Sequence, residues 1–156
     1  MIKNKNIKNI KNIKNIKKLE LTEQIYNEML ELYGTFSEFD KNKFTFLDFK
    51  NIIERLHKNH NIYVYLNHEN KILGAITLLI EQKIIHNGGK VGHIEDFVVL
   101  EEYRNQGIGQ KLLDYVKSIG EKEGCYKLIL DCDPVLEKYY EKKGFTKKGI
   151  YMGVYF

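Results

Sequence analysis

The stretch EDFVVLEEYRNQGIGQKLLDYV, residues 95–116, joins an apolar run to a helix through a turn that contains an arginine and two glycines. Apolar residues recur from Ile108 to Val116 at the spacing of one helical face, which predicts a helix that begins near Gly107. The apolar run before the turn predicts a strand over about 91–100. Because the first N–H groups of a helix have no partner within it, this strand-turn-helix stretch predicts an anion-binding site.

The turn RNQGIG matches neither of two general phosphate loops. The nucleoside triphosphate loop requires Gly-Lys-Ser/Thr four residues after a first glycine, and the dinucleotide fingerprint requires a third glycine three residues beyond the second. Gly107 and Gly109 would still let the backbone approach a diphosphate, since neither has a Cβ, and Arg104 could add a charged donor. The alternative interpretation is that the two glycines only form a tight turn.

Length and composition predict one domain. The 156 residues contain a single proline and 12 scattered glycines, so no linker divides them. The first 18 residues repeat Lys, Asn and Ile every three positions, a period that fits neither a helical face nor a strand. Residues 1–18 are therefore predicted to be a disordered basic tail, whose last residues can join KKLEL in a first strand, and residues 19–156 are predicted to be the folded domain.

The net charge of +4 is mild, and much of the excess lies in the first 18 residues. This favours a small anionic ligand over nucleic acid. The sequence has neither an apolar run of bilayer length nor a signal peptide pattern, so we expect a cytoplasmic protein that does not contact membranes. Cys125 and Cys132 do not suggest a disulfide framework, and nothing completes a zinc site around His57 and His60.

Apolar periodicity and turn residues predict a mixed α/β domain in which helices flank a mostly antiparallel sheet. A helix from Thr22 to Gly34 follows a first strand, and a final strand or hairpin closes the chain. The elements predicted between them are a helix over 45–58, strands within 61–82, a strand over 91–100, a helix over 107–121, a strand over 126–133 and a short helix over 134–144.

With these elements in order, YRNQGIGQKLL and the later YYEKKGF resemble the GCN5-related N-acetyltransferase (GNAT) superfamily over residues 19–156. The resemblance implies a single GNAT domain whose central sheet is splayed at the acetyl-CoA site. It implies that a backbone N–H near Val98 polarises the thioester carbonyl. It also implies that acetyl-CoA contacts Phe97, Val98 and Val99 along its pantetheine arm and Arg104, Asn105, Gln106, Gly107, Ile108 and Gly109 at its pyrophosphate.

The blocks GHIEDFVV, GCYKLILDCD and KYYEKKGF are similar to the eukaryotic glucosamine 6-phosphate N-acetyltransferases. That resemblance implies direct attack of the sugar 2-amino group on acetyl-CoA, on the route to UDP-N-acetylglucosamine, in a homodimer with shared active sites and no metal. The sequence departs from the family pattern at Leu136, where the relatives carry asparagine, and at Tyr155, where an arginine for the sugar phosphate is expected.

Two residues are candidates for proton transfer. Asp131 follows an apolar strand, at the end of a strand where ligand sites are common, so it could orient the amine or take its proton directly or through water. A solvated aspartate at a strand end is the alternative, and the resemblance favours the base. Tyr140 matches the family tyrosine that donates to the departing thiolate, which would leave Tyr139 pointing into the core or the dimer.

The acidic pair Glu95 and Asp96 interrupts an otherwise apolar strand. In the resembled family this pair binds the hydroxyls and the amino group of the sugar, a role that suits carboxylate acceptors. By the same resemblance, further substrate positions are Thr22, Lys83, Tyr126 and Lys127, with Gln82, Ile84 and Ile85 beside them.

Two other functions remain open. A different GNAT enzyme would acetylate a protein N-terminus, a lysine or a polyamine, although such enzymes favour an open peptide groove or an acidic polyamine pocket. A non-catalytic CoA-binding module is the other alternative, and the presence of Asp131 and Tyr140 argues against it. Cys132 could be imagined as an acetyl carrier, but direct amine attack requires none, so it is interpreted as a small buried strand residue.

Overall fold

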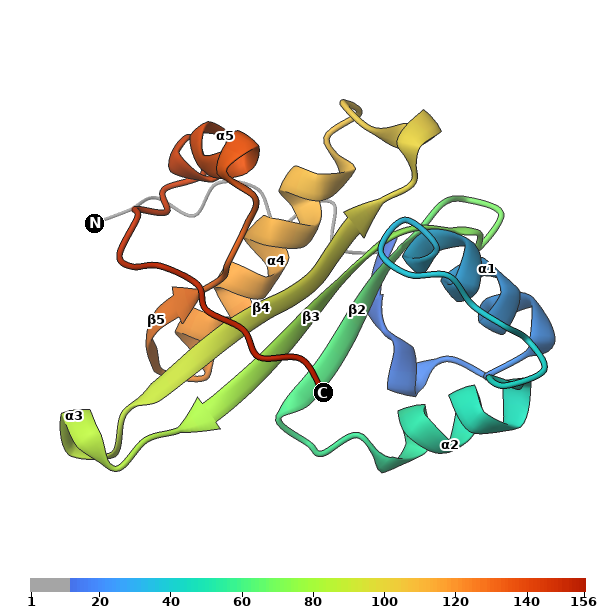
Figure 1. Ribbon diagram of the computed structural model, residues 1–156, viewed down its shortest axis with the longest axis horizontal. Helices are drawn as coiled ribbons and strands as arrows, with labels where there is room; N and C mark the ends of the chain where they lie inside the picture. Colours follow the sequence, from blue (N-terminus) through green and yellow to red (C-terminus); the bar gives the residue numbers. More distant parts are fainter. Residues whose placement is uncertain (1–11) are drawn as a thin grey trace.

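A five-stranded sheet forms the centre of the computed structural model, which describes residues 12–156 (Figure 1). The strands lie side by side in chain order, β1-β2-β3-β4-β5. The first three neighbouring pairs are antiparallel and the β4–β5 pair is parallel, which confirms the predicted mixed, mostly antiparallel sheet. The strands are β1 (Ile13–Asn15), β2 (His60–Leu66), β3 (Ile72–Gln82), β4 (Lys90–Val99) and β5 (Cys125–Ile129).

Helices cover both faces of this sheet. Alternate residues of β3 point to opposite faces: Gly74 faces the α4 residue Leu112, whereas Thr77 faces the end of α1. No helix among residues 12–156 is long and apolar enough to cross a membrane. The helices are α1 (Glu23–Tyr33), α2 (Phe46–Arg55), the short α3 (Ile85–Gly88), α4 (Ile108–Lys122) and α5 (Glu137–Glu141), with 3-10 turns at Ile16–Lys18, Glu101–Tyr103 and Pro134–Leu136.

The first two long helices begin at the threonines that end their preceding loops. The Thr22 side chain accepts a hydrogen bond from the backbone N–H of Ile25. Thr45 forms a capping box with Asp48, in which each side chain accepts from the backbone N–H of the other residue. These caps satisfy N–H groups that would otherwise be unpaired, which explains why both helices start where the sequence predicts.

The predicted boundary between tail and domain at residue 18 is wrong. Ile13 lies in β1 and pairs with Tyr65 at the edge of the sheet, and Ile16 in the following 3-10 turn is fully buried. Lys17 Nζ donates to the backbone carbonyls of His57 and His60, at 2.8 and 2.6 Å. A 3-10 turn has three residues per turn, so it accommodates the three-residue period that fits neither an α-helix nor a long strand. The rest of the predicted tail, residues 1–11, lies outside the described residues.

The C-terminal end also differs from the prediction. Residues 145–156 contain no strand, and the preceding strand ends at Ile129 rather than within LDCD. Figure 1 shows the last residues running in front of β4 and β3, but they pack little on this chain because Tyr155 is 91% exposed. A strand needs a partner edge, and none of the described strands pairs with this segment. The apolar side chains from Ile150 to Phe156 are therefore exposed.

Two irregularities place the functional site in the middle of β4. The pairing of β4 with β5 stops at His93 opposite Ile129, so the two strands are unpaired beyond that point. On the other side, the pairing of β4 with β3 shifts between Ala75 and Thr77, and Asp96 has a left-handed backbone with φ of 47°. This bend, which we call the β4 bulge, turns the side chains near residues 95–97 toward the space beside β5.

Candidate active site

The glycine turn connects β4 to α4. Gly107 caps α4 with φ of 81°, a left-handed conformation that strains any residue with a Cβ, and no side chain bonds the first N–H groups of the helix. Arg104 Nε donates to the carbonyl oxygen of Val99 at 3.2 Å, which orients the exposed guanidinium beside the turn. Free helix N–H groups and a neighbouring guanidinium form a suitable site for a diphosphate.

Gly109 has a packing role as well. A Cβ at this position would lie 3.3 Å from Phe97 Cζ and 3.3 Å from Tyr139 Oη, tighter than ordinary contact. The glycine therefore lets β4 and α5 approach the first turn of α4. Tyr139 is 38% exposed and its hydroxyl lies against this turn, so it does not point into the core. Its other predicted place, at a dimer contact, stays a prediction.

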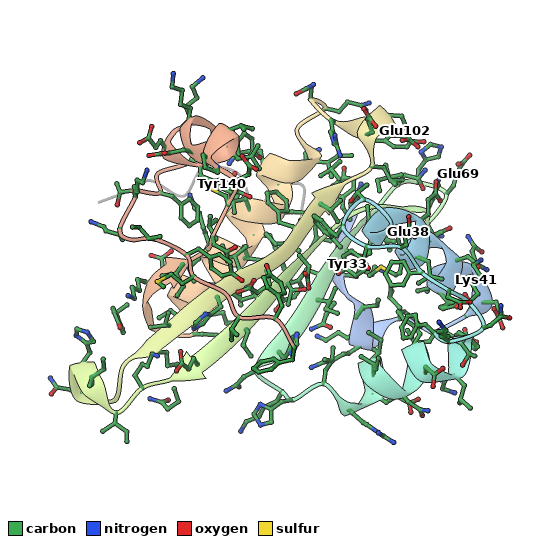
Figure 2. All side chains as sticks on the ribbon, viewed as in Figure 1. Tyr33, Glu38, Lys41, Glu69, Glu102 and Tyr140 are labelled. Atoms are coloured by element: carbon green, nitrogen blue, oxygen red, sulfur yellow. The ribbon has the colours of Figure 1, made fainter. Side chains whose placement is uncertain are left out.

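A pocket beside the β4 bulge gathers the predicted acid, base and sugar-binding residues. Glu95 and Asp96 approach from β4, Asp131 from the segment after β5, and Tyr140 from α5. In Figure 2, Tyr140 on α5 and Tyr33 on α1 lie on either side of β4. The other residues that line this pocket are Phe36, Ile94, Phe97, Leu130, Cys132, Asp133 and Leu136.

The Tyr140 hydroxyl keeps its proton at neutral pH. The pKa of Tyr140 is raised to about 12, chiefly by burial and in smaller measure by the neighbouring Tyr139, Cys132 and Asp131. A neutral phenol in a pocket with a carboxylate is a hydrogen-bond donor and a proton source. Its protonation state therefore suits the acid role predicted from the sequence.

Glu95 is a stronger base than an ordinary glutamate. Burial raises the pKa of its carboxyl, and the negative charges of Asp131 and Asp96 raise it further, while His93 acts in the opposite direction. A carboxylate whose proton affinity is increased can accept a proton from an amine more readily. The sequence assigned Glu95 only to sugar binding, so its place beside Asp131 adds a second candidate base that local patterns do not distinguish.

Comparison with known proteins identifies the family of this chain. The profile of the Acetyltransferase (GNAT) family matches residues 22–145. The chain belongs to the GNAT family. A glucosamine 6-phosphate N-acetyltransferase of Candida albicans is 34% identical over 81% of this chain and 84% of its own length. The crystal structure of glucosamine-6-phosphate N-acetyltransferase from Arabidopsis thaliana superposes with a TM-score of 0.82 and 32% identity, covering 92% of this chain and 97% of that one.

Glucosamine 6-phosphate N-acetyltransferase 1 of Dictyostelium discoideum is more similar over a shorter range. It is 46% identical over 86 residues, which are 55% of this chain and 55% of the relative. A probable glucosamine 6-phosphate N-acetyltransferase 2 of Oryza sativa is matched over 53% of its length. The chain thus spans about half the length of these two curated relatives. Membership in the GNAT family implies acetyl-CoA as the acetyl donor, and the turn at Gly107 fits its diphosphate.

The remaining predicted substrate residues of the GNAT domain do not line this pocket. Lys83 follows β3 and its Nζ lies 2.6 Å from Glu81 Oε1, while Glu81 Oε2 lies 2.8 Å from His93 Nε2. Tyr126 and Lys127 are on β5, where Lys127 pairs with Val91, before the point where β4 and β5 separate. Within one chain these residues form a second group nearer α3.

Thr22 lies still farther from the pocket. It caps the first turn of α1, whereas the last residue of that helix, Tyr33, is the one near Asp96. An 11-residue helix is about 16 Å long. The hydroxyl of Thr22 is therefore explained by its capping bond, and this chain alone does not bring it to the pocket.

The sequence did not identify Phe36 as a pocket residue. Phe36 lies in the loop after α1, is 57% exposed and lines the pocket while its ring centroid lies 6.2 Å from that of Tyr33. An exposed aromatic ring in a loop has no periodic signal, since its position depends on how the loop returns to the sheet. Packing between distant parts of the chain decides whether such a residue lines a pocket.

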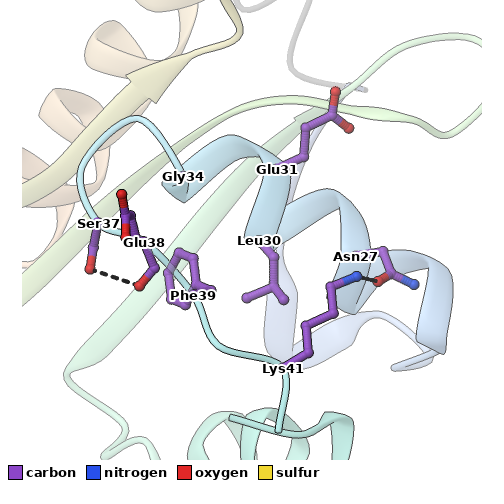
Figure 3. A pocket seen from close by; sticks show the side chains of 8 residues that line it. All are labelled: Asn27, Leu30, Glu31, Gly34, Ser37, Glu38, Phe39 and Lys41. Atoms are coloured by element: carbon purple, nitrogen blue, oxygen red, sulfur yellow. Dashed lines mark hydrogen bonds between the residues drawn. The ribbon is translucent and has the colours of Figure 1, made fainter. Parts of the chain in front are cut away.

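A second hollow lies on the outer side of α1, between this helix and the loop after it (Figure 3). Lys41 Nζ donates to Asn27 Oδ1 at 2.7 Å across one end of the hollow. None of the predicted site residues lines it. Among residues 12–156 there is also no group of three or more His, Cys, Asp or Glu side chains placed to hold a metal ion. The hollow is lined by Asn27, Leu30, Glu31, Gly34, Ser37, Glu38, Phe39 and Lys41.

Proposed function

We propose that this chain transfers the acetyl group of acetyl-CoA to the 2-amino group of glucosamine 6-phosphate, giving N-acetylglucosamine 6-phosphate and CoA for UDP-N-acetylglucosamine biosynthesis. The observation that carries the proposal is the pocket at the β4 bulge, where Glu95, Asp96, Asp131 and Tyr140 meet next to the turn at Gly107. The names of the Candida and Arabidopsis relatives support the same acceptor.

In this proposal, the two halves of the pocket have different tasks. The α4 turn holds the diphosphate of acetyl-CoA, and a backbone N–H near Val98 polarises the thioester carbonyl. Glu95 and Asp96 bind the sugar hydroxyls and hold the amine in line with the carbonyl carbon. As the C–N bond forms and the C–S bond breaks, Asp131, directly or through water, removes a proton from the amine. Tyr140 gives its proton to the departing sulfur.

The sugar phosphate requires cations that the pocket of one chain lacks. Tyr155 replaces the arginine expected from the resemblance, and Lys83 and Lys127 lie outside the pocket. We propose a homodimer in which a second copy covers the exposed apolar side chains of β5 and the C-terminus and supplies such groups to a shared site. The apolar side chains exposed for this contact include Tyr126 and Ile129 on β5 and Ile150, Tyr151, Met152, Val154, Tyr155 and Phe156 at the C-terminus.

A thiol-release assay tests the acceptor. The protein is supplied with acetyl-CoA and one of glucosamine 6-phosphate, glucosamine or a lysine-containing peptide, and free CoA thiol is followed with time. We expect rapid release with glucosamine 6-phosphate, slow release with glucosamine, because it lacks the phosphate, and none with the peptide. Release with the peptide but not with the phosphorylated sugar would assign the chain to another acetyltransferase of the same family.

A further inference from the structure

Two hydroxyl groups are buried together behind the β4 bulge. Tyr33 Oη and Thr77 Oγ1 are the two buried side-chain polar atoms without a hydrogen-bond partner among residues 12–156. Thr77 is only 2% exposed, and its side chain interacts with the hydroxyl of Tyr33, the last residue of α1. The Thr77 side chain lies near enough to the Tyr33 hydroxyl to oppose the rise in its pKa, but the two hydroxyls do not meet the geometry of a formed hydrogen bond. Buried polar groups are nearly always paired, so this pair requires an explanation.

The third group at this position is the Asp96 carboxylate. Thr77 is the cross-strand partner of Glu95, so it lies directly beside the start of the bulge. Asp96 lines the same pocket as Phe36, whose ring centroid lies 6.2 Å from that of Tyr33. Burial raises the pKa of the Tyr33 hydroxyl, and the negative charge of Asp96 acts in the same direction. Groups from α1, β3 and β4 thus converge at one point.

The backbone conformation of Asp96 requires support from its surroundings. Its φ of 47° is left-handed, a conformation that an aspartate adopts at a cost and keeps only where its surroundings hold it. Its side chain is exposed toward the pocket, and no hydrogen bond of this carboxylate to another described side chain is present. The Asp96 carboxylate can therefore accept a hydrogen bond from a water molecule.

We propose that the hydroxyls of Tyr33 and Thr77 hold one buried water molecule that donates a hydrogen bond to Asp96, and that Tyr33 is thereby a positioning residue for the amino-sugar site. A water at this place can accept from both hydroxyls and donate to the carboxylate, which satisfies all three groups. The kinetic consequence rests on the proposed function, because Asp96 acts there on the sugar. The water itself is a property of the folded chain.

Position 77 offers a matched pair of variants. Thr77→Val keeps the shape of the side chain and removes the hydroxyl, whereas Thr77→Ser keeps the hydroxyl and removes the methyl group. If the hydroxyl positions Asp96, Thr77→Val and Tyr33→Phe each raise KM for glucosamine 6-phosphate about threefold to tenfold, the usual effect of one lost hydrogen bond. KM for acetyl-CoA stays unchanged, and Thr77→Ser retains the wild-type KM for the sugar.

Two kinetic results would overturn the proposal. An equal rise in KM with Thr77→Ser and Thr77→Val would assign the effect to packing of the methyl group. An unchanged KM for the sugar in both Thr77→Val and Tyr33→Phe would show that the hydroxyls do not act on the site.

Thermal unfolding gives a readout that requires no substrate and therefore stands even if the sugar is not the acceptor. A shared water predicts that Tyr33→Phe and Thr77→Val each lower Tm, and that the double variant lowers it by less than the sum, because the first change already releases the water. Hydroxyls that truly lack partners predict the opposite sign, since removing an unsatisfied buried group is neutral or stabilising. A Tm that is unchanged or raised in both single variants, or additive losses, would contradict the buried water.

Discussion

Replacing Tyr140 with phenylalanine should lower the turnover of acetyl transfer by about a hundredfold to ten-thousandfold, the range typical for loss of a general acid. The ring stays in the pocket, so KM for acetyl-CoA should remain near that of the wild type. The hydroxyl is the only part removed, and its pKa of about 12 means that it is fully protonated when the thiolate departs. Steady-state kinetics with both substrates varied would measure the two parameters separately.

Tyr139→Phe is the matched control. It removes the neighbouring hydroxyl, which lies against Gly109 rather than in the carboxylate pocket, and the two rings are only 5.1 Å apart. Its turnover should stay close to that of the wild type. Equal loss in both variants would point to a disturbance of α5 as a whole, and an unaffected Tyr140→Phe would remove Tyr140 from the chemistry.

Asp131→Asn should reduce kcat/KM for the amino sugar by about a hundredfold to ten-thousandfold if Asp131 accepts the proton of the amine. Asparagine has almost the same shape but cannot take a proton. A loss well below this range would instead support Glu95, whose raised pKa makes it the other candidate base. Initial rates with saturating acetyl-CoA and limiting sugar would measure the effect.

The same variant makes a prediction for pH. Glu95 has a pKa above the ordinary value, chiefly through burial and then through the charge of Asp131, so it becomes protonated at a higher pH than most glutamates. Activity that requires the Glu95 carboxylate should therefore decline early on the acid side. Removing the charge of Asp131 lowers this pKa, so the acid-side decline of the remaining activity should move to lower pH. A decline that stays in place would show that another group controls it.

The central stretch of the fold could be predicted because its signals are local. Apolar residues with helical spacing define α4, an apolar run defines β4, and the glycine turn lies between them at residues 100–107. The helix caps at Thr22 and Thr45 are equally local, since each depends on a side chain and an N–H three residues away. Such elements need no information about the rest of the chain.

The ends of the domain could not be predicted in the same way. Ile13 and Ile16 are buried because they pack at the edge of β2 and the loop before it, which lie far away in the sequence. The three-residue repeat gives no sign of this packing. The expected last strand has no partner edge among the described strands. Composition alone cannot decide whether such an apolar segment pairs within its chain or contacts another.

The same distinction between local and long-range signals applies to the residues of the site. Asp131 and Tyr140 were identified through resemblance and are brought together with Glu95 and Asp96, as a shared site requires. Phe36 and the hydroxyl pair of Tyr33 and Thr77 were not, because they depend on how α1 and its following loop lie over β3 and β4. Supporting residues of this kind are visible only after the sheet and helices are assembled.

A crystal structure of the protein with CoA and N-acetylglucosamine 6-phosphate would test the central claim most directly. We expect the diphosphate of CoA at the N–H groups of Gly107 and Gly109, the CoA sulfur next to the Tyr140 hydroxyl, and the sugar acetamido group between Asp131 and the Glu95–Asp96 pair. A sugar bound elsewhere, for example in the hollow outside α1, with these carboxylates contacting only solvent, would contradict it.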